Sequence, residues 1–141
     1  MGASGGEAAV WQEARRLAEL LEEITRRLAE KAAGGQVEEL PALLERRQQI
    51  CERLDRLRSE WGIPSWTEGV QAPPAAADAS REIGEIFRRV AGEDDRIRRI
   101  LEERRAAVRE ELDRVRRLRR AQRAYTVEGP LPFGAFIDNK G

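Results

Sequence analysis

The sequence contains no histidine and a single cysteine, Cys51. Histidine is the commonest general base near neutral pH and the commonest transition-metal ligand, so its absence argues against an enzyme and a metal centre. One cysteine cannot form an internal disulfide bond, and we expect Cys51 to serve in packing. Phosphate-binding glycine loops, nucleophile elbows and zinc-type cysteine spacings are also missing. The sequence therefore predicts no enzymatic activity and no cofactor.

Long apolar runs are missing too. No stretch approaches the roughly 18 apolar residues of a membrane-spanning helix, and the amino terminus MGASGG has no basic region followed by an apolar one. We therefore expect a soluble, cytoplasmic protein. Aromatic residues make up only 5% of the chain and charged residues 37%, which is typical of long helices packed along narrow apolar seams. At 141 residues we expect one domain with a modest core.

The first half of the chain has the apolar spacing of a helical hairpin. Ser4 and Glu7 are spaced as in a capping box, and Gly34-Gly35 can end a helix in the left-handed conformation. A first helix over residues 6–33 would bury Val10, Ala14, Leu17, Leu21, Ile24 and Leu28. A second over residues 37–61 would bury Leu40, Leu43, Leu44, Ile50, Cys51, Leu54, Leu57 and Trp61. Arg47 lies within this second stripe, so it should either extend to solvent or pair with an acid on a neighbouring helix.

The second half reads as a long connection followed by one long helix. Residues 62–79 contain three prolines and two glycines, and we expect Trp66 to attach this connection to the bundle. A third helix over residues 80–123 follows, kinked rather than broken at Gly92. At 1.5 Å per residue it would be about 66 Å long, against about 40 Å for each of the others, so part of it should extend beyond them. Its apolar stripe comprises Ile83, Phe87, Val90, Ile97, Leu101, Val108, Leu112 and Val115.

These patterns predict an all-α fold: an antiparallel bundle of three to four helices with a long third helix. We expect the bundle to comprise residues 1–125 and an irregular carboxyl-terminal tail to comprise residues 126–141. On the third helix, Ile86, Ile100, Ala107 and Leu118 lie to one side of the main stripe and broaden it. Ile86 and Ile100 should pack against the other two helices. Leu112, Val115 and Leu118 lie where the helix should extend beyond them, which makes them candidates for binding a partner.

Two charged clusters have both a functional and a structural interpretation. The run RVRRLRRAQR, residues 114–123, has six arginines and no acid. It could bind nucleic acid or an acidic protein, or it could be a solvated face whose charge suits a helix carboxyl terminus. We favour the solvated face, because no nucleic-acid-reading motif accompanies the arginines. The acids Glu93, Asp94 and Asp95 are poor candidates for a metal site, since carboxylate sites in helical bundles normally include histidine.

The chain ends in PFGAFIDNKG, residues 132–141, where apolar side chains occur without a helical period. Phe133, Phe136 and Ile137 either fold back over apolar surface of their own domain or bind another protein. Both alternatives remain open at this stage.

Two stretches resemble a known family. VEELPALLERRQQICERLDRL, residues 37–57, is similar to a family segment in which a leucine-rich turn precedes an Arg-Gln pair. AYT at 124–126 and AFIDNKG at 135–141 look like the tyrosine and the Phe-Ile-Asp-Lys ending of its Gram-positive members. With the order of helical hairpin, proline-rich gap and long helix, the chain resembles the FliT-type flagellar export chaperones and, more distantly, the FlgN-type ones.

The resemblance implies a chaperone for the carboxyl-terminal helical segment of a filament-cap or hook-associated subunit. The chaperone would keep that segment unpolymerised and deliver it to the export gate or to export ATPase components. The tail would either occupy the substrate groove or be recognised by the gate. The candidate partner-binding residues are Leu112, Val115, Leu118, Tyr125, Phe133, Phe136, Ile137 and Asp138. The competing hypothesis is an Arg-rich helical adaptor for nucleic acid or an acidic protein.

Overall fold

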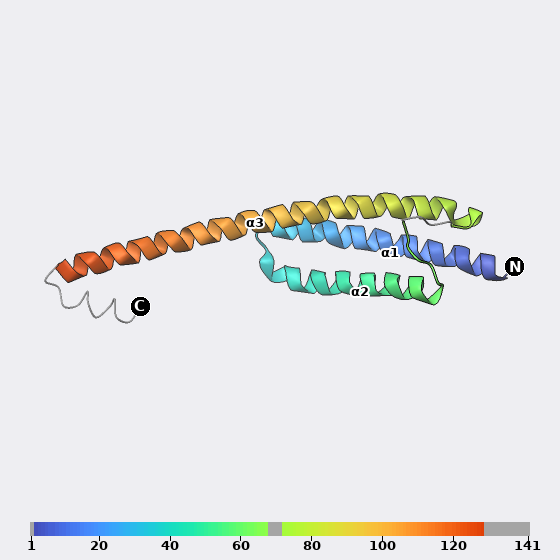
Figure 1. The fold of residues 1–141 in the computed structure, drawn as a ribbon, viewed down its shortest axis with the longest axis horizontal. Helices are drawn as coiled ribbons and strands as arrows, with labels where there is room; N and C mark the ends of the chain where they lie inside the picture. Colours follow the sequence, from blue (N-terminus) through green and yellow to red (C-terminus); the bar gives the residue numbers. More distant parts are fainter. Residues whose placement is uncertain (1, 68–71, 129–141) are drawn as a thin grey trace. The chain divides into compact units, whose positions relative to one another are not determined.

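The computed structural model describes residues 2–67 and 72–128, with side chains from residue 6 to residue 124. In this part of the chain every regular element is helical: α1 (Gly2–Ala33), α2 (Leu40–Glu60), α3 (Ala77–Glu128), and the short 3-10 turns η1 (Val37–Glu39) and η2 (Pro74–Ala76). The predicted all-α fold with a long third helix is confirmed (Figure 1).

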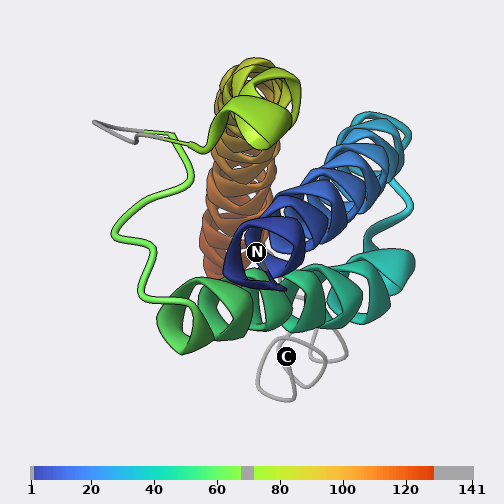
Figure 2. The same ribbon diagram turned by 90° about the vertical axis from the view of Figure 1, so that its right-hand side faces the viewer.

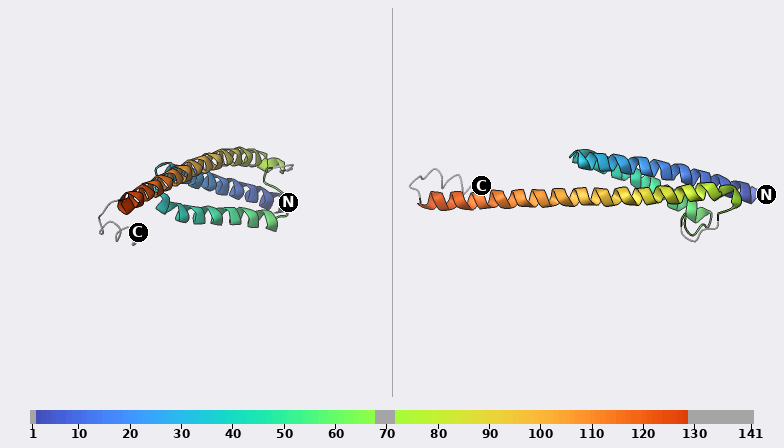
Figure 3. Two further views of the ribbon diagram at one scale, coloured as in Figure 1. Left: turned by 60° about the vertical axis from the view of Figure 1, so that its left-hand side comes forward. Right: turned by 90° about the horizontal axis from the view of Figure 1, so that it is seen from above.

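The chain divides into two compact units, one up to Ile100 and the other from Leu101 onward. In the first unit α1 and α2 run antiparallel and lie side by side, as the left view of Figure 3 shows. The part of α3 up to Ile100 completes a three-helix bundle with them, seen in Figure 2 from the end where α1 begins. The remainder of α3 belongs to the second unit. The division into a bundle of residues 1–125 and a separate tail stays a prediction.

The amino terminus of α1 differs from the prediction. The helix begins at Gly2, not at residue 6, so Ser4 lies within it and is not its capping residue. A contact with the end of α2 accounts for part of the extension: a Cβ atom at Gly6 would lie 2.9 Å from the Trp61 ring. Only glycine allows the indole to approach this closely, and the contact holds the first turns of α1 against α2.

Glycines end both helices of the hairpin, and in each case the backbone forms a Schellman motif. Gly35 has a φ of 76°. Its N–H donates to the carbonyl of Ala32, and the next residue, Gln36, donates to Lys31. Gly62 repeats the pattern with a φ of 64°: Gly62 donates to Ser59 and Ile63 to Arg58. The predicted end of the first helix at Gly34-Gly35 is confirmed.

The core of the first unit follows the predicted stripe of α1, all of whose members are buried. Opposite them lie Leu43 and Leu54 from α2 and Ile83, Ile86 and Val90 from α3. Ile86 is therefore a core residue, as predicted, and Ile100 is half-buried. By contrast, Leu44 and Trp61 are exposed. That part of the prediction is wrong, because only a narrow face of α2 is turned toward the other helices.

Trp66 attaches the connection after α2 to the core, as predicted. Its ring is buried and meets Trp11 edge to face, with ring centroids 4.9 Å apart and an interplanar angle of 86°. Its Nε1 donates to the carbonyl of Leu54 at 3.4 Å. Trp66 thereby packs the connection against α1 and α2.

Helix α3 is longer than predicted at both ends and continues through Gly92 without a break. Gly92 is exposed, and a Cβ atom there would meet nothing within 4 Å, so its local space would accept a side chain. After Gly92 the sequence has no glycine or proline until Gly129 and Pro130. Because these two residues are the next helix breakers, α3 continues five residues past position 123, to Glu128.

Candidate functional site

The second unit exposes a row of large apolar residues on α3. Leu112 is 50% exposed, Val115 37% and Leu118 59%. Their spacing of three residues keeps them on neighbouring positions of one helical surface. We call these three residues the α3 face. Leu101 and Val108, two further members of the predicted apolar stripe, are also exposed. Within the predicted stripe only Ile83 and Val90 are buried, and Phe87 and Ile97 are half-buried.

Arginines border the α3 face. Arg119 follows Val115 by four residues and Leu112 by seven, so it lies on the same side of the helix. Two arginines of the run pair with acids one turn earlier: Arg114 with Glu111 at 2.6 Å and Arg116 with Asp113 at 3.8 Å. Arg117, Arg119 and Arg120 have no ion pair with any residue that the structure describes. The arrangement therefore combines an apolar surface with unneutralised positive charge.

The other predicted site residues are not brought together with the α3 face by the described structure. Ala107 is exposed. Tyr125 lies in the last turns of α3, but its side chain falls outside the described part. Phe133, Phe136, Ile137 and Asp138 all fall outside the described residues.

The acidic cluster on α3, Glu93, Asp94 and Asp95, forms ion pairs with arginines. Asp94 accepts two hydrogen bonds from Arg47, at 2.5 and 2.8 Å, across the gap between α2 and α3. This contact raises the pKa of Arg47 and confirms one of the two expected alternatives, pairing with an acid on a neighbouring helix. Glu93 lies near Arg96 and Asp95 near Arg98. No group of three potential metal ligands occurs among the described residues.

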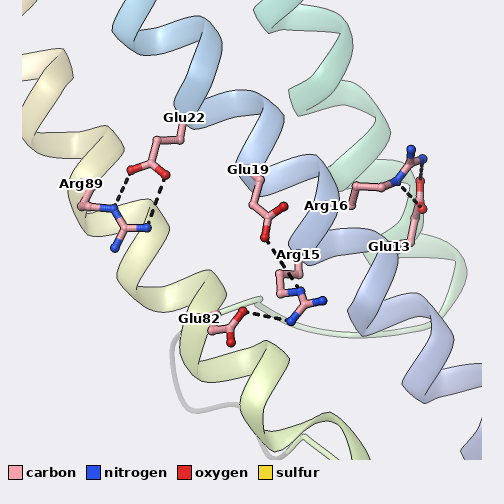
Figure 4. A network of polar contacts seen from close by, with 7 residues as sticks. All are labelled: Glu13, Arg15, Arg16, Glu19, Glu22, Glu82 and Arg89. Carbon is pink, nitrogen blue, oxygen red and sulfur yellow. Dashed lines mark hydrogen bonds and ion pairs between the residues drawn. The ribbon is translucent and has the colours of Figure 1, made fainter.

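Two further ion pairs join α1 to α3 (Figure 4). Arg15 donates to Glu82 at 3.0 Å. Glu22, a buried acid, accepts from Arg89 Nε at 2.5 Å and from Arg89 Nη2 at 3.3 Å. The hydrogen bond from Arg89 lowers the pKa of Glu22 below its ordinary value of 4.5, although burial acts in the opposite direction. Glu22 is thus held in its charged form between α1 and α3.

The lowered pKa of Glu22 predicts a pH-dependent stability. A depressed carboxyl pKa contributes stability that is present above the unfolded value, here 4.5, and is lost as the pH falls through the folded value. Glu22→Gln should therefore lower the melting temperature near pH 7, and the difference from the wild type should shrink toward about pH 3. Thermal melts followed by circular dichroism across this range measure the effect.

Glu19→Gln provides the matched control, because Glu19 is exposed on the same helix and lies 4.0 Å from Arg15. It should change the melting temperature little at any pH. A Glu22→Gln deficit of equal size at all pH values would mean that side-chain charge is not its cause.

None of the described helices is both long and apolar enough to cross a membrane.

Comparison with known proteins supplies the context for this arrangement. The family model described as flagellar protein FliT matches residues 15–127. The match begins within α1 and reaches almost to the end of α3, so it includes most of the bundle and the α3 face. No curated protein and no solved structure matches the chain. Because the match covers most of the sequence, the chain belongs to the FliT family of flagellar proteins, which are non-enzymatic export chaperones.

Proposed function

We propose that the α3 face of this flagellar export chaperone binds the carboxyl-terminal helical segment of a filament-cap or hook-associated subunit. The observation that carries the proposal is the exposure of Leu112, Val115 and Leu118 in a chain of this family. A subunit that polymerises through an amphipathic helix has an apolar stripe that aggregates when bare. The α3 face offers that stripe an apolar surface until export.

The binding mode would be a helix against a helix, with leucine-type anchors of the substrate packed across the α3 face. The exposed parts of three aliphatic side chains contribute about 1 kcal/mol each when covered. Because even a millimolar complex requires about 4 kcal/mol, other contacts of the chaperone would add to this one, and its modest strength would allow release of the subunit at the export gate or to export ATPase components.

An Arg-rich adaptor for nucleic acid or an acidic protein is the second candidate, favoured by the unneutralised arginines beside the α3 face. A salt titration separates the two. Binding of a peptide comprising the carboxyl-terminal helix of a filament-cap or hook-associated subunit should change little between low and high salt. Binding to phosphate backbones falls steeply with salt. Tight, salt-sensitive binding of double-stranded DNA, with no binding of any subunit peptide, would replace the chaperone proposal.

The tail offers a further test. If residues 129–141 cover the α3 face in the absence of substrate, their deletion should raise substrate affinity while α1, α2 and α3 stay folded. A face that is open about 10% of the time would gain about tenfold, near 1.4 kcal/mol. Isothermal titration with the subunit peptide measures this.

Phe133→Ser combined with Phe136→Ser should reproduce most of the gain, because burial of two aromatic rings would be the main cause of docking. Unchanged affinity in both variants, together with loss of export in cells, would favour a tail that is recognised by the gate.

A further inference from the structure

The first unit contains a second surface, separate from the α3 face. An open groove of about 280 Å³ runs between α1 and α2. Leu17, Leu20 and Ile24 from α1 and Ile50 from α2 line it. Leu17 and Ile24 are buried core residues, whereas Leu20 is 40% exposed. The base of the groove is therefore aliphatic, and Leu20 is the part of it that contacts solvent.

The rim of this groove is positively charged. Arg27 stands on the α1 side, and Arg46 and Arg53 stand on the α2 side. The one acid among the lining residues, Glu23, already accepts a hydrogen bond from Arg27 at 2.8 Å. Three arginines against one glutamate leave a net charge of +2 on the lining.

The two arginines on the α2 side differ in their partners. Arg53 lies 3.7 Å from Glu13, but Glu13 is already held by Arg16 through two hydrogen bonds. Arg46 makes no hydrogen bond or ion pair with any described residue. The N–H donors of its guanidinium therefore have no partner among the described residues. They lie at the edge of an apolar surface, where they can donate hydrogen bonds to a carboxylate of another protein.

We infer that this groove, which we call the α1–α2 groove, docks a short amphipathic helix of a partner protein that carries acidic residues along one edge. The apolar side of that helix would cover Leu20 and Ile50, and a carboxylate at its edge would accept from Arg46. Leu17 and Arg27 are ten residues apart on α1, a length of about 15 Å. The groove therefore takes about three turns of helix.

A helical protein segment fits this surface better than a nucleic acid does. Single-stranded nucleic acid is usually held by aromatic side chains on which bases stack, and all the apolar lining residues are aliphatic. The inference does not depend on the proposed function, because the α1–α2 groove lies in the first unit and the α3 face in the second. Each surface can be altered without the other.

The experiment uses two synthetic helical peptides of about 18 residues, long enough to form a helix in water. Both have leucines at the same helical spacing, and one carries glutamates along its edge where the other carries lysines. The full-length protein with p-benzoylphenylalanine at position 20 should form a photo-cross-link with the glutamate peptide. In fluorescence anisotropy measurements, Arg46→Glu should lower the affinity of the protein for the glutamate peptide at least about tenfold and raise its affinity for the lysine peptide.

The matched control is Arg56→Glu, which makes the same charge change at an exposed position of α2 outside the groove. It should change the affinity for the glutamate peptide by less than about threefold, since it alters only the long-range field. Equal effects of Arg46→Glu and Arg56→Glu, or equal affinity for the two peptides, would overturn the inference. So would cross-linking at position 118 but not at position 20.

The same experiments also test two other possible occupants of the α1–α2 groove. If sedimentation shows a dimer that Arg46→Glu dissociates, the groove is filled by a second copy of the chain and the inference is wrong. If deletion of residues 129–141 is required before the peptide cross-links at position 20, the tail is the resident occupant and the inference is again wrong. Val115→Asp should leave the cross-link at position 20 unchanged even if it abolishes substrate binding, so failure of one proposal is distinguishable from failure of the other.

Discussion

Trp66→Ala should destabilise the first unit by about 3–5 kcal/mol, a large part of the stability of a small domain. The substitution removes a buried ring from the core, its edge-to-face contact with Trp11 and its hydrogen bond to the Leu54 carbonyl. It also frees the connection between α2 and α3 from the bundle. Urea unfolding followed by tryptophan fluorescence measures the loss.

Trp61→Ala is the matched control, because it removes the same side chain from an exposed position. Trp61 is 44% exposed, and its described close contact is with Gly6. The cost should be about 1 kcal/mol. If the two variants lose equal stability, Trp66 does not hold the connection to the core as the geometry indicates.

Val115→Asp should weaken binding of the subunit peptide by about 30-fold, or about 2 kcal/mol, and leave the free energy of unfolding nearly unchanged. The reason is that the substitution places a charge in the middle of the α3 face, where an apolar contact with substrate is proposed. Isothermal titration and urea unfolding of the same preparation give the two quantities.

Ala106→Asp is the control for this variant. Position 106 precedes Val115 by nine residues, which is half a turn around the helix, so the new charge lies on the opposite side. Ala106 is exposed, and its substitution should affect neither quantity. A fall in the melting temperature of Val115→Asp that matches its loss of binding would mean that the residue is part of a core.

The prediction from sequence was accurate for the features of the first unit that depend on a single local rule, such as helical periodicity or the ending of a helix at glycine. Val10, Ala14, Leu17 and Leu21 recur at helical spacing and all are buried, and the glycine pair ends α1 as expected. Periodicity says which residues share a face, but not whether a neighbour covers that face. This is why Leu44 was expected to be buried and proved to be exposed.

The ends of α1 and α3 and the α1–α2 groove required information from elsewhere in the chain. Trp61 packs against Gly6 across fifty-five positions of sequence, and no local rule for helix starts includes such a contact. The apolar spacing placed Leu21 in the core and left Leu20 outside the stripe, but it does not tell that Leu20 and Ile50 line one groove. Whether Arg46 has a partner depends on acids on α1. The placement of the α3 face within one helix, by contrast, could be predicted from spacing alone.

The position of the tryptophans gives the protein an internal optical reporter. All three, Trp11, Trp61 and Trp66, precede Leu101, where the second unit begins. Indole absorption and emission therefore sense the first unit alone, and the perpendicular pair of Trp11 and Trp66 gives that unit its own near-ultraviolet dichroism. Peptide-bond dichroism in the far ultraviolet sums over all of α3. Comparing the two wavelength ranges in a single heating experiment resolves whether the segment from Leu101 to Glu128 loses its helix before the bundle melts, without labelling or truncating the chain.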